Sequence, residues 1–207
     1  METQANHVDK IFEEGSTPAK FVRNYASYLS TLLEKMDARA VEKVIECFLA
    51  ARERGNTLYF IGNGGSAATA SHFANDLTIG TRGAHKPFKA VSLTDNVAVL
   101  TAVGNDSGYD QIFVQQLQAL LAKGDVVIAI SASGNSPSVL KGVEYANTRG
   151  GITVGITGFD GGLLAQSCAI RLHVDTPKGE YGPVEDMHLI FNHMIGNYLM
   201  RVVRHNA

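Results

Sequence analysis

Residues 57–77 read TLYFIGNGGSAATASHFANDL, a short apolar and aromatic run followed by small residues and a longer mixed segment. The run Thr57–Ile61 predicts a buried strand, and Ser66–Ile79, which stops before Gly80, has the length and composition of a helix. Between them lies the glycine-rich turn Gly62–Ser66. A turn of this kind that opens a helix directs backbone N–H groups to one point, so an anion can bind there.

The same segment carries two chemically active side chains. His72 and Asp76 are four residues apart, so they project from nearly the same face of the predicted helix. They are candidates for an acid–base or metal-binding pair. The alternative is an exposed ion pair, which stabilises a helix by only a few tenths of a kcal/mol.

The alternation of strand, polar turn and helix continues through the chain and predicts an α/β fold. Strands separated by helices form a parallel sheet with helices on both faces, and ligands then bind at the carboxyl ends of the strands. The later strands are expected at 88–93, 126–130, 152–156 and 170–174. The intervening helices are expected at 94–103 (capped by Thr94 and Asp95 and broken at 104–108), 109–121, from Ser136 and Pro137 to Gly150, and 163–167, with a long final helix at 184–204.

Two amphipathic helices are expected before the first strand. Residues 1–16 are polar and predicted to be irregular or a frayed helix, whereas Thr17 followed by Pro18 is a typical helix start. Asp37 is expected to cap the second helix, which closes at Gly55. We expect both helices to pack on the sheet or on a second subunit.

The composition of the 207 residues is that of an ordinary globular protein, with 45% apolar and 18% charged residues. A net charge of −2 gives no reason to expect nucleic acid or an anionic membrane as a partner. No signal-peptide pattern and no apolar run of about 20 residues occurs, so a cytoplasmic protein is expected. Cys47 and Cys168 have no CxxC spacing and are predicted to be buried thiols.

The first turn also matches the dinucleotide-binding pattern G-x-G-x-x-A, from Gly62 to Ala67. That pattern requires an acidic residue about 20 positions further on, at the end of the next strand. Asp95 lies too far along the chain and fits better as a helix cap. No nucleotide cofactor is therefore expected, although a dinucleotide-dependent enzyme remains an alternative.

A second turn favours phosphate. Residues 131–137 read SASGNSP, follow the third strand and also open a helix. Three hydroxyls and a run of free backbone N–H groups suit a phosphate monoester, which accepts several hydrogen bonds at once. The alternative is that these serines only cap the following helix and bind no ligand.

The last helix adds a cluster of ionisable residues, Glu185, Asp186, His188 and His193, in an otherwise apolar segment. Glu185 and Asp186 lie in the first turn, where negative charge is favourable to the helix dipole. That explanation does not extend to His193, which lies further along the helix. The alternative to a functional role for His193 is that it is a structural histidine buried in the core.

These motifs together resemble the sugar isomerase (SIS) domain family, and within it the phosphoheptose isomerase group. The resemblance rests on Gly-Asn-Gly-Gly-Ser-Ala at 62–67, Ser-x-Ser-Gly-Asn-Ser at 131–136, the pair Asn105 and Asp106, and the helix that carries His193. It implies a three-layer αβα sandwich with a five-stranded parallel sheet, formed by one SIS domain over 1–207 with residues 1–56 as a helical arm. It also implies a homotetramer with active sites at subunit junctions, and often a zinc ion.

Carried over residue by residue, the resemblance assigns the binding of substrate and its phosphate to Asn63, Gly64, Ser66, Asp95, Ser131, Ser133 and Ser136. It assigns catalysis to His193 and Asp76, and zinc binding to His72, Asp76, Glu185 and His193. Three positions depart from the family pattern: Asp76 replaces a glutamate, Glu185 replaces a glutamine, and Ala132 replaces a common threonine. Because eight residues of helix rise ~12 Å, Glu185 and His193 can share an ion only if their side chains converge.

The function implied is aldose–ketose isomerisation of sedoheptulose 7-phosphate to D-glycero-D-manno-heptose 7-phosphate through an enediol. The main alternative is a non-catalytic SIS protein, either a sensor of sugar phosphates or a scaffold that binds a replication initiator. A scaffold needs the fold and the tetramer but no acid–base pair.

Overall fold

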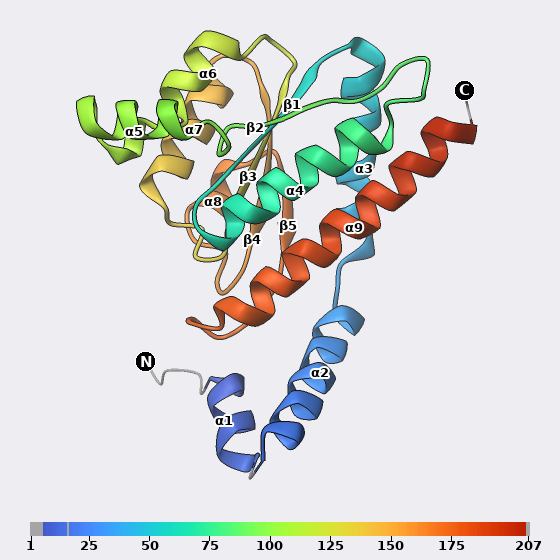
Figure 1. The fold of residues 1–207 in the computed structure, drawn as a ribbon, viewed down its shortest axis with the longest axis vertical. Helices are drawn as coiled ribbons and strands as arrows, with labels where there is room; N and C mark the ends of the chain where they lie inside the picture. The colour runs from blue at the N-terminus through green and yellow to red at the C-terminus, as the bar shows by residue number, and fades with distance from the viewer. Residues whose placement is uncertain (1–5, 16, 206–207) are drawn as a thin grey trace.

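The computed structural model describes residues 6–15 and 17–205, and its centre is a five-stranded parallel sheet (Figure 1). The strands lie in the order β2-β1-β3-β4-β5, and each neighbouring pair is parallel. Their bounds are β1 (Thr57–Gly62), β2 (Lys89–Ser92), β3 (Val126–Ser131), β4 (Ile152–Thr157) and β5 (Ile170–His173). The predicted sheet is confirmed, with strand ends that differ by a residue or so.

Helices cover both faces of the sheet, which gives the predicted three layers. One face is covered by α3 (Ala38–Arg54), α4 (Gly65–Gly80) and α9 (Tyr181–His205) (Figure 1). The other face is covered by α5 (Val97–Asp106), the 3₁₀ turn η1 (Tyr109–Gln111), α6 (Val114–Leu120), α7 (Pro137–Thr148) and α8 (Leu164–Ser167). None of the helices within the described residues is long and apolar enough to cross a membrane.

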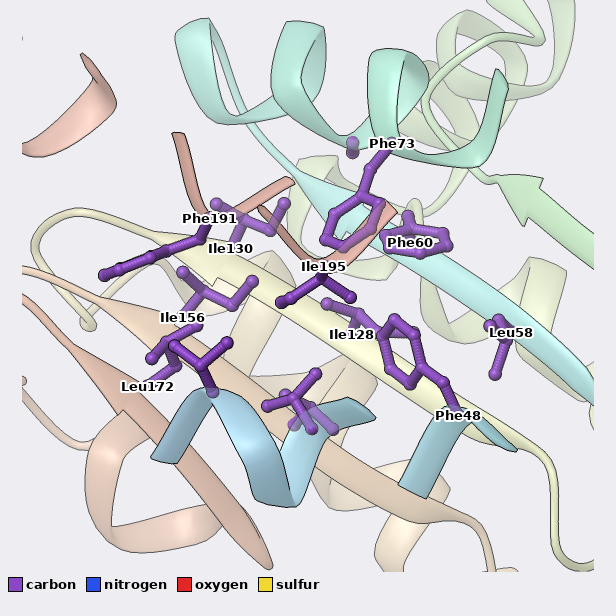
Figure 2. Packing of buried hydrophobic residues seen from close by; sticks show 14 of the residues in the cluster. Phe48, Leu58, Phe60, Phe73, Ile128, Ile130, Ile156, Leu172, Phe191 and Ile195 are labelled. Atoms are coloured by element: carbon purple, nitrogen blue, oxygen red, sulfur yellow. The ribbon is translucent and has the colours of Figure 1, made fainter. Parts of the chain in front are cut away.

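Alternating side chains of β1 fill the two core layers, as expected for a strand covered on both sides. Phe60 packs into the layer of α3, α4 and α9, whereas Tyr59 and Ile61 belong to the opposite layer. The ring of Phe60 lies 4.9 Å from that of Phe73 on α4 and 6.3 Å from that of Phe48 on α3 (Figure 2). This aromatic cluster fixes α4, and with it the glycine-rich turn, against the first strand.

Helices α4 and α9 lie side by side on the same face of the sheet (Figure 1). They pack closely at one end, since a Cβ added to Gly80 would lie 2.3 Å from Sδ of Met200. The residues along α4 therefore face those along α9 over most of their length.

The N-terminal helices α1 (His7–Glu14) and α2 (Pro18–Glu34) extend away from the sheet (Figure 1). The predicted cap holds, because Thr17 accepts a hydrogen bond from the backbone N–H of Lys20. Leu32 is the buried residue of α2, and the apolar residues on either side of it along the helix are only half-buried in the single chain. Glu180, just before α9, anchors this arm by accepting hydrogen bonds from His7 and from the Tyr28 hydroxyl.

Five local predictions need correction. Residues 7–14 form a regular helix because the Asn6 side chain caps it. The cap of α5 is Asn96, which accepts a bond from Val99 N at 3.2 Å, and not Thr94 or Asp95. The helix continues through Gly104 to Asp106, and the expected helix at 109–121 is divided into η1 and α6.

The fifth correction concerns the cysteines, which are free but only half-buried. Burial still raises the pKa of both thiols, that of Cys168 to about 11. Both therefore remain protonated near neutral pH.

His188 lies in the core rather than in a site. It is 1% exposed, and its Nε2 lies 3.2 Å from the carbonyl oxygen of Thr157, to which it donates in the neutral form. Its Nδ1 has no partner among the described residues. Burial lowers the pKa of His188 to about 4, because a proton on Nδ1 would be buried without an acceptor.

This arrangement predicts acid sensitivity. The unfolded chain takes up the His188 proton near pH 6.5 and the folded chain only near pH 4, so stability is present above pH 6.5 and is lost as the pH falls through this window. The free energy of unfolding should drop by about 3 kcal/mol from this residue. The free energy of unfolding of His188→Gln, measured with urea, should therefore fall less between pH 7 and pH 4 than that of the wild-type protein, and the difference should equal this contribution. An equal loss in this variant and in the exposed-site control His85→Gln would contradict the assignment.

Candidate active site

A cavity of about 290 Å³ lies where β1 and β3 end and where α4 and α7 begin. Both predicted turns contribute to it, so the structure brings the two motifs together. Its lining residues are Asn63, Gly64, Gly65, Ser66, Ile130, Ser131, Ala132, Ser133, Ser136, Tyr181 and Glu185. We call it the serine cavity.

Two helix N-termini point their backbone N–H groups at the serine cavity. Gly64 is the N-cap of α4 and has no side chain to cap it. Ser136 is the N-cap of α7, but its hydroxyl makes no capping bond and lies 3.3 Å from that of Ser131. Since no side chain caps either helix, the first amides of both are available to an anion, and a phosphate group suits them.

The second serine turn is held rigidly. Gly134 has φ +62, and a Cβ there would lie 2.0 Å from the carbonyl oxygen of Gly161. The Asn135 amide donates to Ser133 O at 2.8 Å and accepts from Leu163 N at 3.1 Å. The Gly-Asn pair of the motif therefore shapes the turn, while the serines face the cavity.

Asn63 is fixed at the rim of the serine cavity. Its Nδ2 donates to the Ser138 hydroxyl, and its Oδ1 accepts from the Tyr109 hydroxyl, both at 2.9 Å. Tyr109 and Tyr181 are side chains at this rim that sequence reasoning missed, because nothing in their spacing distinguishes them from surface aromatics.

Asp95 lies apart from the serine cavity. Its carboxylate accepts a hydrogen bond from the Ser71 hydroxyl of α4 and lies 3.2 Å from Thr94 Oγ1. It is not among the residues that line the cavity. Its assignment to substrate binding stays a prediction.

The candidate catalytic residues converge at a second point along the same helices. His72 Nε2 lies 3.3 Å from Asp76 Oδ2, and His193 Nε2 lies 3.5 Å from His72 Nε2. One ligand atom from each of the three residues lies within 4.8 Å of the other two. A metal ion could therefore be held by these side chains, which we call the histidine group.

His193 is exposed, so the alternative of a core histidine does not hold. The periodicity of α9 turns Asn192 and Ile195 into the core and His193 toward His72. The sequence drew attention to the histidine but not to Asn192, which donates to Asp76 Oδ2 at 3.2 Å.

Glu185 is not part of the histidine group. A Cβ added to Gly65 would lie 2.3 Å from Glu185 Oε2, so this carboxylate rests on the first turn of α4. Burial, and then the charge of Asp186, raise the pKa of Glu185. The side chain thus places a carboxylate at a helix N-terminus that faces the serine cavity.

The position of Glu185 leads to a prediction. A carboxylate at the α4 N-terminus repels a phosphate in the same cavity, and Glu185→Gln removes that charge. The variant should bind inorganic phosphate about 5- to 10-fold more tightly at pH 8. Calorimetric titration checks this, with Glu46→Gln on α3 as the matched control. Weaker phosphate binding in Glu185→Gln would contradict the prediction.

Helices α4 and α9 contribute residues to both the serine cavity and the histidine group. From Ser66 to His72 helix α4 rises ~9 Å, and from Glu185 to His193 helix α9 rises ~12 Å. The open-chain form of a phosphorylated heptose has a length of this order. The two parts can therefore act on opposite ends of one molecule.

Comparison with known proteins agrees with this geometry. Residues 20–158 match the SIS domain family. A phosphoheptose isomerase of Aliarcobacter butzleri is 36% identical over 179 residues, which cover 84% of this chain and 92% of the relative. A phosphoheptose isomerase of Trichlorobacter lovleyi is 39% identical over 165 residues, or 77% of this chain and 84% of the relative.

A solved structure extends the likeness to the fold. The phosphoheptose isomerase of Neisseria gonorrhoeae superposes with a TM-score of 0.82 at 30% identity, covering 90% of this chain and 100% of that one. The fold, the two glycine- and serine-containing turns and the similarity over most of the chain lead to one conclusion: the chain belongs to the SIS domain family, in its phosphoheptose isomerase group.

Proposed function

We propose that this protein is a phosphosugar isomerase that converts sedoheptulose 7-phosphate to D-glycero-D-manno-heptose 7-phosphate. The observation that supports the proposal is that helices α4 and α9 contribute residues to both the serine cavity and the histidine group, candidates for binding a phosphate and for moving a proton. An isomerase needs both, because the phosphate holds the sugar while a proton moves at its other end.

The serine cavity binds the phosphate. Ser66, Ser131, Ser133 and Ser136 present hydroxyls beside the amides of two helix N-termini, and Asn63 contacts the sugar. Gly64 is required because a side chain there would need the left-handed φ of +55. This half of the site supplies orientation rather than chemistry.

The histidine group moves the proton. His193 is the acid–base candidate, because an imidazole can both accept and donate a proton. Asp76 is the candidate base or metal ligand. One of them removes a proton from C1 of the ketose, next to the carbonyl at C2, and protonation of the carbonyl oxygen gives the enediol. Loss of the proton on the C1 oxygen and return of a proton to C2 then give the aldose.

The same donor set suits zinc. Ligand atoms at 2.0–2.2 Å around a tetrahedral ion lie ~3.4 Å apart. His72 Nε2 lies 3.3 Å from Asp76 Oδ2 and 3.5 Å from His193 Nε2, and all three ligand atoms lie within 4.8 Å of one another. His72, Asp76 and His193 would hold the ion, and Glu185 would join only by rotating away from Gly65. Bound zinc would polarise the carbonyl or stabilise the enediolate oxygens.

We place the site at a junction between subunits of a homotetramer in the cytoplasm. Met194 and Tyr198 of α9 are 38% and 53% exposed next to His193, and Phe12 and Val22 of the arm are 72% and 63% exposed. Exposed apolar residues along the same helix as the site favour a second copy as the partner.

The proposed function is tested by mixing the protein with sedoheptulose 7-phosphate, with added zinc or with a chelator, and following the aldose by NMR. Appearance of a heptose 7-phosphate supports the proposal. Unphosphorylated sedoheptulose is the control and should not react. Tight binding of the phosphorylated sugar without conversion under any metal condition would favour a sensor of the same fold.

A further inference from the structure

Asn192 occupies an unusual position in α9. It is 0% exposed and lies between core residues Phe191 and Ile195. Among the described residues it is the one asparagine that is buried. A polar amide in such a place needs an explanation, because burial of its hydrogen-bonding groups costs stability.

The hydrogen bonds of Asn192 do not favour a purely structural role. Its Nδ2 donates to Asp76 Oδ2 at 3.2 Å, but its Oδ1 has no partner among the described residues. A buried acceptor left unpaired is destabilising, whereas an apolar side chain of similar shape carries no such penalty. The presence of an amide at this buried position is therefore explained by the hydrogen bond that its Nδ2 donates to Asp76.

That target is a carboxylate with few other restraints. Asp76 Oδ2 faces His72, and the Asp76 side chain is 22% exposed. The other contact, from Asn75 Nδ2 to Asp76 Oδ1, is 3.5 Å long, at the outer limit for a hydrogen bond. The bond from Asn192 is thus the one that comes from a rigid, fully buried group.

We propose that Asn192 is a positioning residue, which holds the Asp76 carboxylate in the orientation that brings it together with His72 and His193. The inference rests on the proposed function of these three residues. Groups that hold a catalytic or metal-binding carboxylate typically change activity or metal affinity by about 10- to 100-fold when removed. Because the side chain is buried, it does so without touching the substrate.

The test compares Asn192→Leu with Asn197→Leu, the same change about one turn further along α9. Asn197 is exposed, and its Nδ2 donates to the backbone oxygen of His193 rather than to Asp76. The measurements are the melting temperature, zinc affinity by competition with a chelator, and kcat and KM for sedoheptulose 7-phosphate. If Asn192→Leu does not fold, Asn192→Ala replaces it.

Asn192→Leu should melt at or above the wild-type temperature, bind zinc about 10-fold more weakly and lose about 10- to 100-fold in kcat, with KM changed less than about 3-fold. Asn197→Leu should match the wild type in zinc affinity and kcat. Wild-type zinc affinity in the folded Asn192 variant overturns the inference, even if kcat falls. If the wild-type protein binds zinc but isomerises nothing, the proposed function fails and the zinc comparison still decides the role of Asn192. A wild-type protein that does neither overturns both.

Discussion

His193→Ala should lower the kcat for sedoheptulose 7-phosphate by about 100- to 10,000-fold, the range expected when an acid–base group is removed. His193 Nε2 lies 3.5 Å from His72 Nε2. Because the His193 side chain is exposed, its removal should leave the fold unchanged. Phosphate affinity should stay within about 3-fold of wild type, because His193 does not line the serine cavity. Steady-state kinetics and phosphate titration measure the two effects separately.

The control for this variant is His85→Ala, which removes an exposed histidine from the segment before β2. It should retain wild-type kcat. A His193→Ala protein that keeps full turnover would show that the acid–base group lies elsewhere. Loss of phosphate binding together with kcat would show that the substitution disturbs more than the proton transfer.

Asp76→Asn should be as damaging, with a fall in kcat of about 100- to 10,000-fold. The substitution preserves the shape of the side chain and removes its negative charge, and with it the ability to act as base or as an anionic ligand. Zinc affinity should fall as well, because the substitution removes the negative charge of the one carboxylate in the candidate metal-binding group. Turnover and competition with a chelator are the measurements.

Two further variants define the role of Asp76. Asp76→Glu keeps the carboxylate and should exceed Asp76→Asn in kcat by at least about 10-fold. Asp9→Asn, an exposed change on α1, should leave kcat unchanged. Equal activity of Asp76→Asn and the wild-type protein would remove Asp76 from the mechanism.

The fold was predictable because its main features are local. The apolar run of β3 and the glycine turn after β1 specify their elements without help from distant residues, and Thr17 and Asp37 cap the helices as expected. Around α5 the local signals were ambiguous. Thr94, Asp95 and Asn96 are all possible N-cap residues. Asn96 is the cap because the chain after β2 enters the helix at Val97.

The site was predictable to the extent that it lies on single elements. The His72 and Asp76 pair follows from helical spacing, and the serine turn from its position after a strand. The contacts between α4 and α9 were not predictable, because they depend on how two helices far apart in the sequence pack. Asn192 and the placement of Glu185 over Gly65 both arise there.

The most direct test of the central claim is isomerisation of sedoheptulose 7-phosphate in D₂O by the zinc-loaded protein, followed by proton NMR. The claim is that one site holds the phosphate and moves a proton between neighbouring carbons through an enediol. It predicts a heptose 7-phosphate that carries solvent deuterium at the carbon next to its carbonyl, with both product and label lost in His193→Ala. Product and label formed at the wild-type rate by His193→Ala, or no product from the wild-type protein with or without zinc, would contradict it.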